Sequence, residues 1–85
     1  MKSVDFEPKA LEEFVYWAHN NTKIFDKING LLKDIGRNGA AKGIGKPEKL
    51  KHHDGWSRRI TEEHRLVYNV DEKYIHVIPC KGHYE

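Results

Sequence analysis

An apolar stripe at helical spacing constrains the fold of this chain more than any other part of its sequence. Apolar residues recur there every three or four positions, at Ile24, Ile28, Leu31, Leu32 and Ile35. This spacing predicts an α-helix with one buried face. Asn38-Gly39 follows the stripe, and glycine commonly ends helices because it adopts a left-handed backbone without strain. A helix with one apolar face must pack against a second layer of structure.

The residues before this stripe predict a short strand and a first helix. Residues 2–6 alternate polar and apolar side chains, as a half-buried strand does. Pro8 suits the first position of a helix, where its missing N–H costs nothing. Asn20-Asn21 ends the helical pattern, in which four apolar residues recur: Leu11, Phe14, Val15 and Ala18.

The residues after the stripe predict an antiparallel sheet. Glycines at 39, 43 and 45 lead to Lys46-Pro47, a composition typical of a loop. Beyond residue 51, three segments have the composition and alternation of strands: 56–60, 65–70 and 74–80. The order β-α-α followed by an antiparallel meander predicts an α+β domain whose helices pack on one sheet face.

Length and composition predict a single cytoplasmic domain spanning residues 1–85. A domain of 85 residues buries about 60 to 65% of the surface that its unfolded chain exposes. Hydrophobic residues make up 38% and charged residues 33% of the chain, as in globular proteins. The sequence has no apolar run of the length that a signal peptide or a membrane span needs. Cys80 is the only cysteine, which excludes an internal disulfide and fits a reducing compartment.

Positive charge is concentrated in the middle of the chain. The net charge of +2 is too small to argue for nucleic-acid binding by itself. Residues 31–60, however, hold eight Lys or Arg against three Asp or Glu, whereas the segments before and after are slightly acidic. We therefore expect a cationic surface in the middle third, close to Glu48.

The alternation of the predicted strands places two arginines together. If Ile60 and Leu66 both face the helices, Arg59 and Arg65 share the opposite, open face, because side chains alternate with period two. Pro79 and Gly82 interrupt the pattern of the last strand. Periodicity alone therefore does not say where His83 points.

Three residues have the side chains needed to cut RNA without a metal. Cleavage by the 2′-hydroxyl of RNA requires a base for that hydroxyl, positive charge for the transition state and an acid for the leaving 5′-oxygen. Glu48 is the candidate base and Arg65 the phosphate clamp. His83 is the candidate acid, because an imidazole has an ordinary pKa of about 6.5. By composition alone, each of the three would more often be an ordinary surface residue.

Three stretches of the sequence are unusual for so short a chain: GKPEKLK at 45–51, WSRRITEEHRLVY at 56–68, and His83-Tyr84. They resemble the YoeB family of bacterial toxin-antitoxin modules. The resemblance continues through Tyr16-Trp17 and residues 27–29 and 32–35. It implies that Glu48, Arg65, His83 and Tyr84 occupy the catalytic positions of the family.

The resemblance also implies a fold, an activity and partners. The expected fold is the compact one of small microbial ribonucleases, the RelE/YoeB fold. The expected activity is that of a ribosome-dependent endoribonuclease that cuts messenger RNA in the A site and stops translation. The expected partners are the ribosome with its mRNA, a cognate antitoxin and a second copy of the toxin, with no role for a membrane.

Several further residues are candidates for contact with RNA. Phosphate contacts supply most of the sequence-independent affinity for nucleic acid. We expect such contacts from three basic residues, each of which fits a solvated face equally well: Lys51, Arg58 and Arg59. Trp56 either stacks on a base or, as we favour, belongs to the core or a dimer contact. Tyr84 stacks on a base or anchors the tail.

Two other residue patterns have simple interpretations. Glu63 either holds Arg65 by a salt bridge or is a solvated turn residue. His52-His53-Asp54 is a poor metal site, because adjacent strand residues point to opposite faces and no cysteine cluster or HExxH motif accompanies them. We therefore predict neither a metal nor another cofactor.

Two rival functions fit the same scaffold. One is an inhibitor that cuts nothing, as in fold relatives that poison gyrase. The acid-base set of Glu48, Arg65 and His83 argues against it, since a pure inhibitor needs no such set. The other is an inactive relative that binds RNA or antitoxin and has kept only the shape. Cleavage on translating ribosomes separates all three functions.

Overall fold

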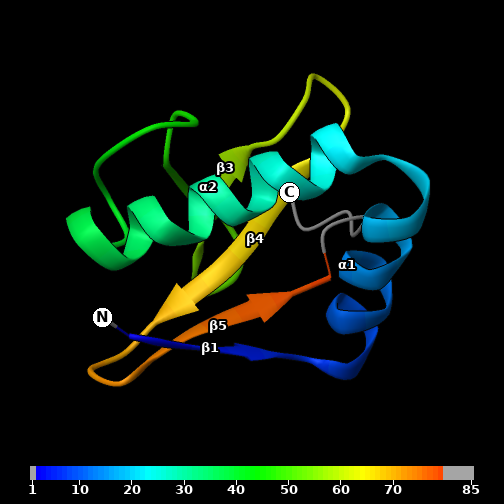
Figure 1. The fold of residues 1–85 in the computed structure, drawn as a ribbon. Helices are drawn as coiled ribbons and strands as arrows, with labels where there is room; N and C mark the ends of the chain where they lie inside the picture. The colour runs from blue at the N-terminus through cyan, green and yellow to red at the C-terminus, as the bar shows by residue number, and fades with distance from the viewer. Residues whose placement is uncertain (1, 80–85) are drawn as a thin grey trace.

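Two helices pack on a five-stranded sheet (Figure 1). The structure is a computed structural model that describes residues 2–79. The strands are β1 (Ser3–Phe6), β2 (Glu48–Lys49), β3 (Trp56–Arg59), β4 (Arg65–Val70) and β5 (Tyr74–Ile78), and the helices are α1 (Pro8–Asn20) and α2 (Thr22–Asn38). The predicted α+β class, with helices followed by an antiparallel meander, is confirmed.

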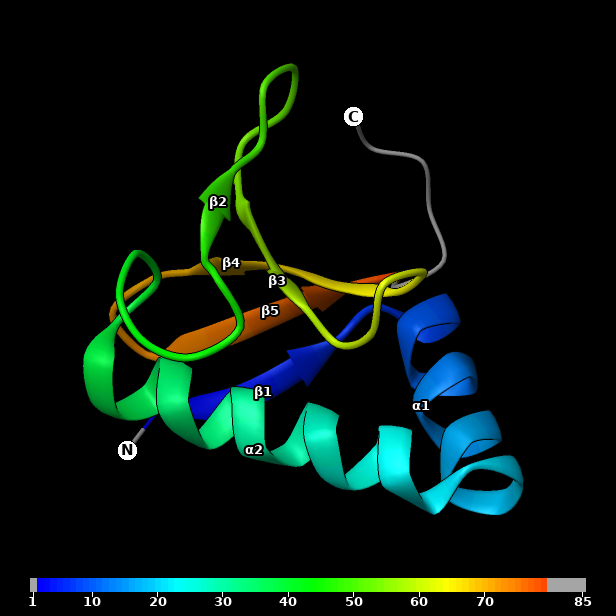
Figure 2. The ribbon, with the colours of Figure 1, turned by 90° about the horizontal axis from the view of Figure 1, so that it is seen from above.

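The sheet is mixed because the first strand joins the last one. Its order is β1-β5-β4-β3-β2, with β1 parallel to β5 and all other neighbours antiparallel. In Figure 2, α2 runs along one side of the sheet and α1 stands at the end of α2, beside the end of β1. The inner face of the sheet is the one that faces the helices, and the outer face is the opposite one.

The apolar stripe of α2 forms the centre of the core, as predicted. All five of its residues are buried: Ile24, Ile28, Leu31, Leu32 and Ile35. They pack with inner-face residues of the sheet, among them Leu66, Tyr68, Ile75 and Val77. Asn21 begins α2, because its side-chain oxygen accepts a hydrogen bond from Ile24 N. Gly39 ends α2 with a positive φ of 87°, as its position after the stripe predicts.

The predicted apolar face of α1 is wrong in part. Pro8 occupies the first turn as expected. Leu11 and Val15 are nevertheless 47% and 46% exposed, while the buried positions are Ala10, Glu13 and Trp17. Phe14, a member of the predicted stripe, does face inward, where it packs between Phe6 of β1 and Phe25 of α2. The buried face of the helix follows positions 10, 13, 14 and 17, a helical spacing that is offset by one residue from the predicted stripe.

Each predicted strand is present, with differences of one or two residues in some bounds, and one further strand was not predicted. β4 spans the predicted residues 65–70, whereas β3 ends one residue before the predicted end and β1 begins one residue after the predicted start. The third segment, predicted to reach Cys80, ends at Ile78, and Cys80 lies outside the described residues. The two-residue strand β2 was not predicted, because two residues are too few to show alternation. No helix within residues 2–79 is long and apolar enough to cross a membrane.

Candidate active site on the outer face of the sheet

Strand pairing brings Glu48 and Arg65 to one region of the sheet. Glu48 of β2 lies opposite Ser57 of β3, and Arg59 of β3 lies opposite Arg65 of β4. Residues that pair across antiparallel strands point to the same face, as do residues two apart on one strand. All four side chains therefore belong to the outer face. The predicted sharing of that face by Arg59 and Arg65 is confirmed.

Neighbouring side chains orient the guanidinium of Arg65 and, among the described residues, leave one of its nitrogens without a hydrogen bond. Its Nε donates a 2.9 Å hydrogen bond to Ser57 Oγ. Its Nη2 lies 3.7 Å from Glu48 Oε1, which is an ion pair but is too long for a hydrogen bond. Nη2 is buried and has no hydrogen-bond partner among the described residues. A buried, charged donor without a hydrogen bond destabilises the folded protein unless a ligand accepts a hydrogen bond from it.

Burial differs between the two members of this ion pair. The Glu48 side chain is 66% exposed, whereas that of Arg65 is 32% exposed. Ser57 and Val67, also on the outer face, are buried. The carboxylate can therefore reach a substrate from solvent, while Arg65 is held in a partly enclosed position. The pair therefore joins an exposed carboxylate to a more enclosed cation.

Further positive charge surrounds this pair. Arg59 is exposed and lies directly opposite Arg65 on the neighbouring strand. Like charges in this relationship repel each other, so an anion bound between them would be favoured. Lys51 is also exposed, just after β2, whereas Lys49 lies opposite Trp56 and so points to the inner side. Arg59 and Lys51 thus supply exposed positive charge from the middle of the chain, on or next to the strands that carry Glu48 and Arg65.

The structure contradicts the predicted phosphate contact of Arg58. This side chain is fully buried, on the inner face opposite Leu66. Its Nη1 is paired with Asp34 Oδ2 at 2.5 Å. The sequence held a signal for this, because Arg58 lies two residues before Ile60 and so shares the helix-facing side. A guanidinium that is already enclosed and paired cannot also contact RNA.

The buried ion pair affects two titratable groups. The hydrogen bond from Arg58 lowers the pKa of Asp34, an effect that outweighs the opposing effect of burial. Burial raises the pKa of Tyr68, although the hydrogen bond from Arg58 opposes the rise. Asp34 is therefore charged and Tyr68 neutral near neutral pH, which is the combination that satisfies a buried arginine.

Two other predicted site residues are not at the outer-face site. Trp56 is partly buried and packs against the core on the inner face, opposite Tyr68, which supports the core interpretation over base stacking. Glu63 lies in the turn before β4, where its N–H donates to Thr61 Oγ1. Within residues 2–79, the carboxylate paired with Arg65 is that of Glu48 and not that of Glu63. The predicted support of Arg65 by Glu63 is therefore not seen.

Two candidate residues lie outside the described part of the chain. His83 and Tyr84 follow residue 79, so their roles stay predictions. Sequence reasoning also missed one functional candidate, Ser57. Its hydroxyl orients Arg65, and its place two residues before Arg59 was the available signal. Among residues 2–79, no group of three or more His, Cys, Asp or Glu side chains is arranged to hold a metal ion.

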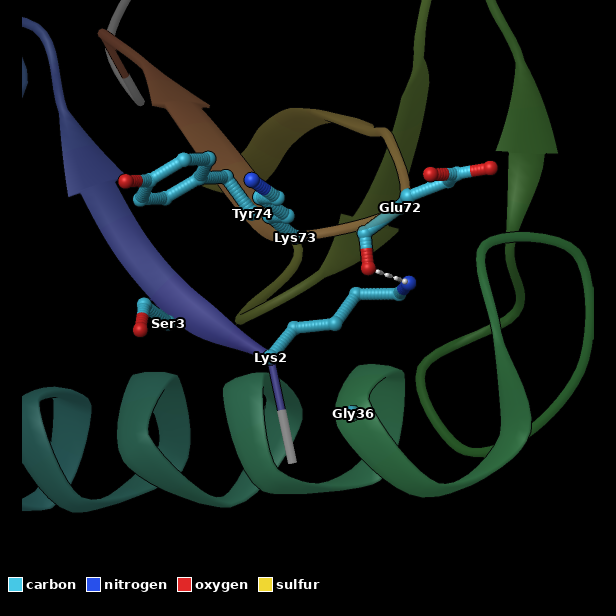
Figure 3. A pocket seen from close by; sticks show the side chains of 6 residues that line it. All are labelled: Lys2, Ser3, Gly36, Glu72, Lys73 and Tyr74. Carbon is cyan, nitrogen blue, oxygen red and sulfur yellow. Dashed lines mark hydrogen bonds between the residues drawn. The ribbon is translucent and has the colours of Figure 1, made fainter.

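An open pocket lies elsewhere, between the start of β1, α2 and the β4–β5 turn (Figure 3). It is lined by Lys2, Ser3, Gly36, Glu72, Lys73 and Tyr74, and the Lys2 ammonium donates to the Glu72 carbonyl. None of the predicted site residues lines it. The turn follows the end of β4 opposite to Arg65, so this pocket is separate from the Glu48–Arg65 site.

The chain is similar to known toxins over nearly its whole length. The family model described as "YoeB-like toxin of bacterial type II toxin-antitoxin system" matches residues 6–84. Toxin YoeB of Escherichia coli (strain K12) is 47% identical over 78 residues, covering 89% of this chain and 92% of the relative.

Solved structures agree with this similarity. A YoeB dimer from Staphylococcus aureus superposes with a TM-score of 0.91 at 52% identity, covering 98% of both chains. A heterotetrameric YoeB-YefM toxin-antitoxin complex from the same organism superposes with a TM-score of 0.90 at 51% identity, covering 99% of both chains. The RelE/YoeB fold implied by the sequence is thereby confirmed. This chain belongs to the YoeB-like toxins of bacterial type II toxin-antitoxin systems.

Proposed function

We propose that this toxin is a ribosome-dependent endoribonuclease that cuts messenger RNA in the A site without a metal. The observation that carries the proposal is the Glu48–Arg65 pair, in which Arg65 Nη2 is buried, lacks a hydrogen-bond partner and lies 3.7 Å from the carboxylate. A phosphate oxygen that approaches as the groups covering Nη2 move aside would accept the hydrogen bond that this donor lacks. The exposed Arg59 opposite Arg65 supplies a second positive charge for the same anion.

The proposed reaction uses the RNA's own 2′-hydroxyl. The exposed carboxylate of Glu48 takes the proton of that hydroxyl, whose oxygen then forms a bond to the adjacent phosphorus. Arg65 stabilises the negative charge on the phosphoryl oxygens in the transition state. The bond from phosphorus to the 5′-oxygen breaks, and His83 gives that oxygen a proton. The products are a 2′,3′-cyclic phosphate, which can open to a 3′-phosphate, and a 5′-hydroxyl.

The roles of His83 and Tyr84 rest on the resemblance to the family. His83 is the proposed acid, and Tyr84 either stacks on a base or anchors the tail. Lys51 and Arg59 are proposed to contact backbone phosphates, because both are exposed and lie on or near the elements that carry Glu48 and Arg65. Such contacts position the RNA without reading its sequence.

Partners are proposed from the relatives. The heterotetrameric YoeB-YefM complex from Staphylococcus aureus supports a cognate antitoxin for this toxin, and the YoeB dimer from the same organism supports association with a second copy. The ribosome and mRNA are proposed because the exposed Glu48–Arg65 surface offers little by itself to hold a substrate in place. A cytoplasmic location is the one in which these partners occur.

Cleavage on translating ribosomes tests the proposal. Wild-type protein should cut ribosome-bound mRNA, and Arg65→Ala should slow single-turnover cleavage by at least about a hundredfold, as loss of one electrostatic stabiliser does. Arg37→Ala is the matched control, because Arg37 is an exposed arginine in the last turn of α2. A folded wild-type protein that inhibits growth but leaves mRNA intact would instead favour the gyrase-poison-like function. One that neither cuts nor inhibits would favour an inactive relative.

A further inference from the structure

The segment that leads to Glu48 is built around one buried side chain. Residues 39–45 leave the end of α2 and turn back toward β2, as the green segment in Figure 2 shows. They contain no helix or strand. A segment of this kind usually keeps its shape through side-chain hydrogen bonds or packing. Here the guanidinium of Arg58 supplies the hydrogen bonds.

Arg58 binds three backbone carbonyl groups of this segment. Nη2 donates to Gly39 O at 2.9 Å and to Lys42 O at 2.7 Å. Nη1 donates to Ile44 O at 3.0 Å. With the bonds to Asp34 and Tyr68, the Arg58 side chain uses donors on all three of its nitrogens. A buried, fully satisfied guanidinium holds its acceptors in one arrangement.

Asp34 and Tyr68 extend the same network to α2 and β4. Asp34 Oδ2 accepts from Arg58 Nη1 and, at 3.0 Å, from Ile44 N. The Tyr68 hydroxyl accepts from Arg58 Nε at 2.9 Å and donates to Ala40 O at 2.7 Å. Each of these two side chains therefore contacts both Arg58 and the segment that surrounds it.

The end of the segment is hydrogen-bonded to β3, the strand that carries Arg58. Gly45 O accepts a 2.7 Å hydrogen bond from Arg59 N. Gly45 has a φ of 83°, and a Cβ atom there would lie 2.7 Å from the Leu31 side chain. Lys46 also has a positive φ, of 52°. The backbone is thus tightly specified up to two residues before Glu48.

We propose that Arg58, together with Asp34 and the Tyr68 hydroxyl, forms a positioning network that holds Glu48 beside Arg65. The inference rests on the proposed function, because it assigns the network a role in the reaction through Glu48. None of the three side chains touches the RNA in this account. The network fixes residues 39–45, and these fix where β2 begins and where the carboxylate of Glu48 points.

A double-mutant cycle tests the coupling between the network and Glu48. Tyr68→Phe removes one hydroxyl that joins Arg58 to Ala40 and keeps the buried ring. Single-turnover cleavage on ribosomes should fall by about tenfold, since misplacing a catalytic group by about 1 Å costs up to about a hundredfold. In the Glu48→Gln background the same substitution should change the rate by less than about twofold. An equal loss in both backgrounds, or none in either, would overturn the positioning role.

Amide hydrogen exchange gives a second readout that does not depend on activity. Tyr68→Phe and Asp34→Asn should speed exchange in residues 40–49 while residues 65–70 keep their protection. Asn38→Ala is the matched control, because Asn38 also donates to Asp34 but from the exposed end of α2. Unchanged exchange in residues 40–49 would contradict the positioning role alone. If the Glu48→Gln protein itself cleaves at the wild-type rate, then Glu48 is not the base, and the error lies in the proposed function and not in the positioning network.

Discussion

Arg65 Nε donates a 2.9 Å hydrogen bond to Ser57 Oγ on the neighbouring strand. Ser57 in turn lies opposite Glu48 in the β2–β3 pair. The serine is buried, so water does not readily replace this bond. One hydroxyl therefore links the proposed phosphate clamp to the strand pair that carries the proposed base, and it sets the direction in which the guanidinium points.

Ser57→Ala should lower cleavage more than binding. The substitution removes the bond that orients Arg65, and a misaligned cation stabilises the transition state less well. We expect single-turnover cleavage at saturating ribosomes to fall by about tenfold, with affinity for ribosomes nearly unchanged. Asn69→Ala is the control, since Asn69 lies on the same face of β4 but is exposed. A Ser57→Ala protein as active as wild type would show that the bond is dispensable.

Lys51→Ala should have the opposite pattern. Lys51 is exposed just beyond β2, so its proposed contact with a phosphate contributes to binding rather than to the chemical step. Affinity should fall, and the slope of log affinity against log salt should decrease by about one counterion, while cleavage at saturation changes little. Ribosome binding measured across a salt series checks this. If Lys51→Ala and Arg65→Ala change binding and cleavage in the same proportion, the division of roles is incorrect.

The stability of the fold should depend on pH through His76. Its Nε2 is hydrogen-bonded to Asp71 at 2.7 Å and its Nδ1 to Asp5 at 2.9 Å. These two contacts raise the pKa of His76 above its ordinary value of 6.5, and the contact with Asp71 has the larger effect. The same hydrogen bond lowers the pKa of Asp71 to about 2. The folded state binds the His76 proton more tightly than the unfolded state does. The contribution of these contacts to the free energy of unfolding is therefore fully present below pH 6.5 and is lost as the pH rises through the raised pKa of His76.

Denaturant unfolding of His76→Gln checks this sign. The urea midpoint of the wild type should exceed that of the variant, and the difference should be larger at about pH 6 than at about pH 9. His52→Gln is the control, because His52 is exposed in the turn before β3. A wild-type advantage that grows as pH rises would contradict the assignment.

The two helices should respond very differently to alanine substitution. Leu31→Ala in α2 should cost about 2 to 5 kcal/mol of unfolding free energy, since the side chain is fully buried. Leu11→Ala in α1 should stay within about 0.5 kcal/mol of wild type, because Leu11 is 47% exposed. Chemical denaturation of both variants provides the comparison. Equal costs would mean that α1 buries the face that its sequence stripe predicts.

Local patterns in the sequence predicted those elements whose burial is periodic. The α2 stripe and the residues of β4 are each long enough to show a period, and both agree with the structure. The prediction for the first helix failed in part, because its buried face includes the charged Glu13 and is set by contacts with other elements, such as the packing of Phe14 on Phe6 and Phe25. Such packing joins residues that are distant in sequence, and periodicity within one helix does not report it.

Only part of the candidate site could likewise be predicted from local patterns in the sequence. Alternation along the strands predicted the shared face of Arg59 and Arg65, and the same rule, applied one residue earlier, assigns Arg58 to the inner face. What alternation cannot supply is the partner of a buried charge. Asp34 lies 24 residues away in the sequence from Arg58, and only the folded chain brings the two together. The contact of Glu48 with Arg65 likewise depends on β2, which is too short to predict.

The most direct test of the central claim uses mRNA modified at the cut nucleotide. Cleavage by the RNA's own hydroxyl requires a free 2′-OH on the nucleotide before the broken bond. On translating ribosomes, wild-type protein should cut unmodified mRNA to a 2′,3′-cyclic phosphate or 3′-phosphate and a 5′-hydroxyl, and should leave mRNA with a 2′-O-methyl group at that nucleotide uncut. Cleavage of the methylated mRNA at the unmodified rate, or a product with a 5′-phosphate, would contradict the account.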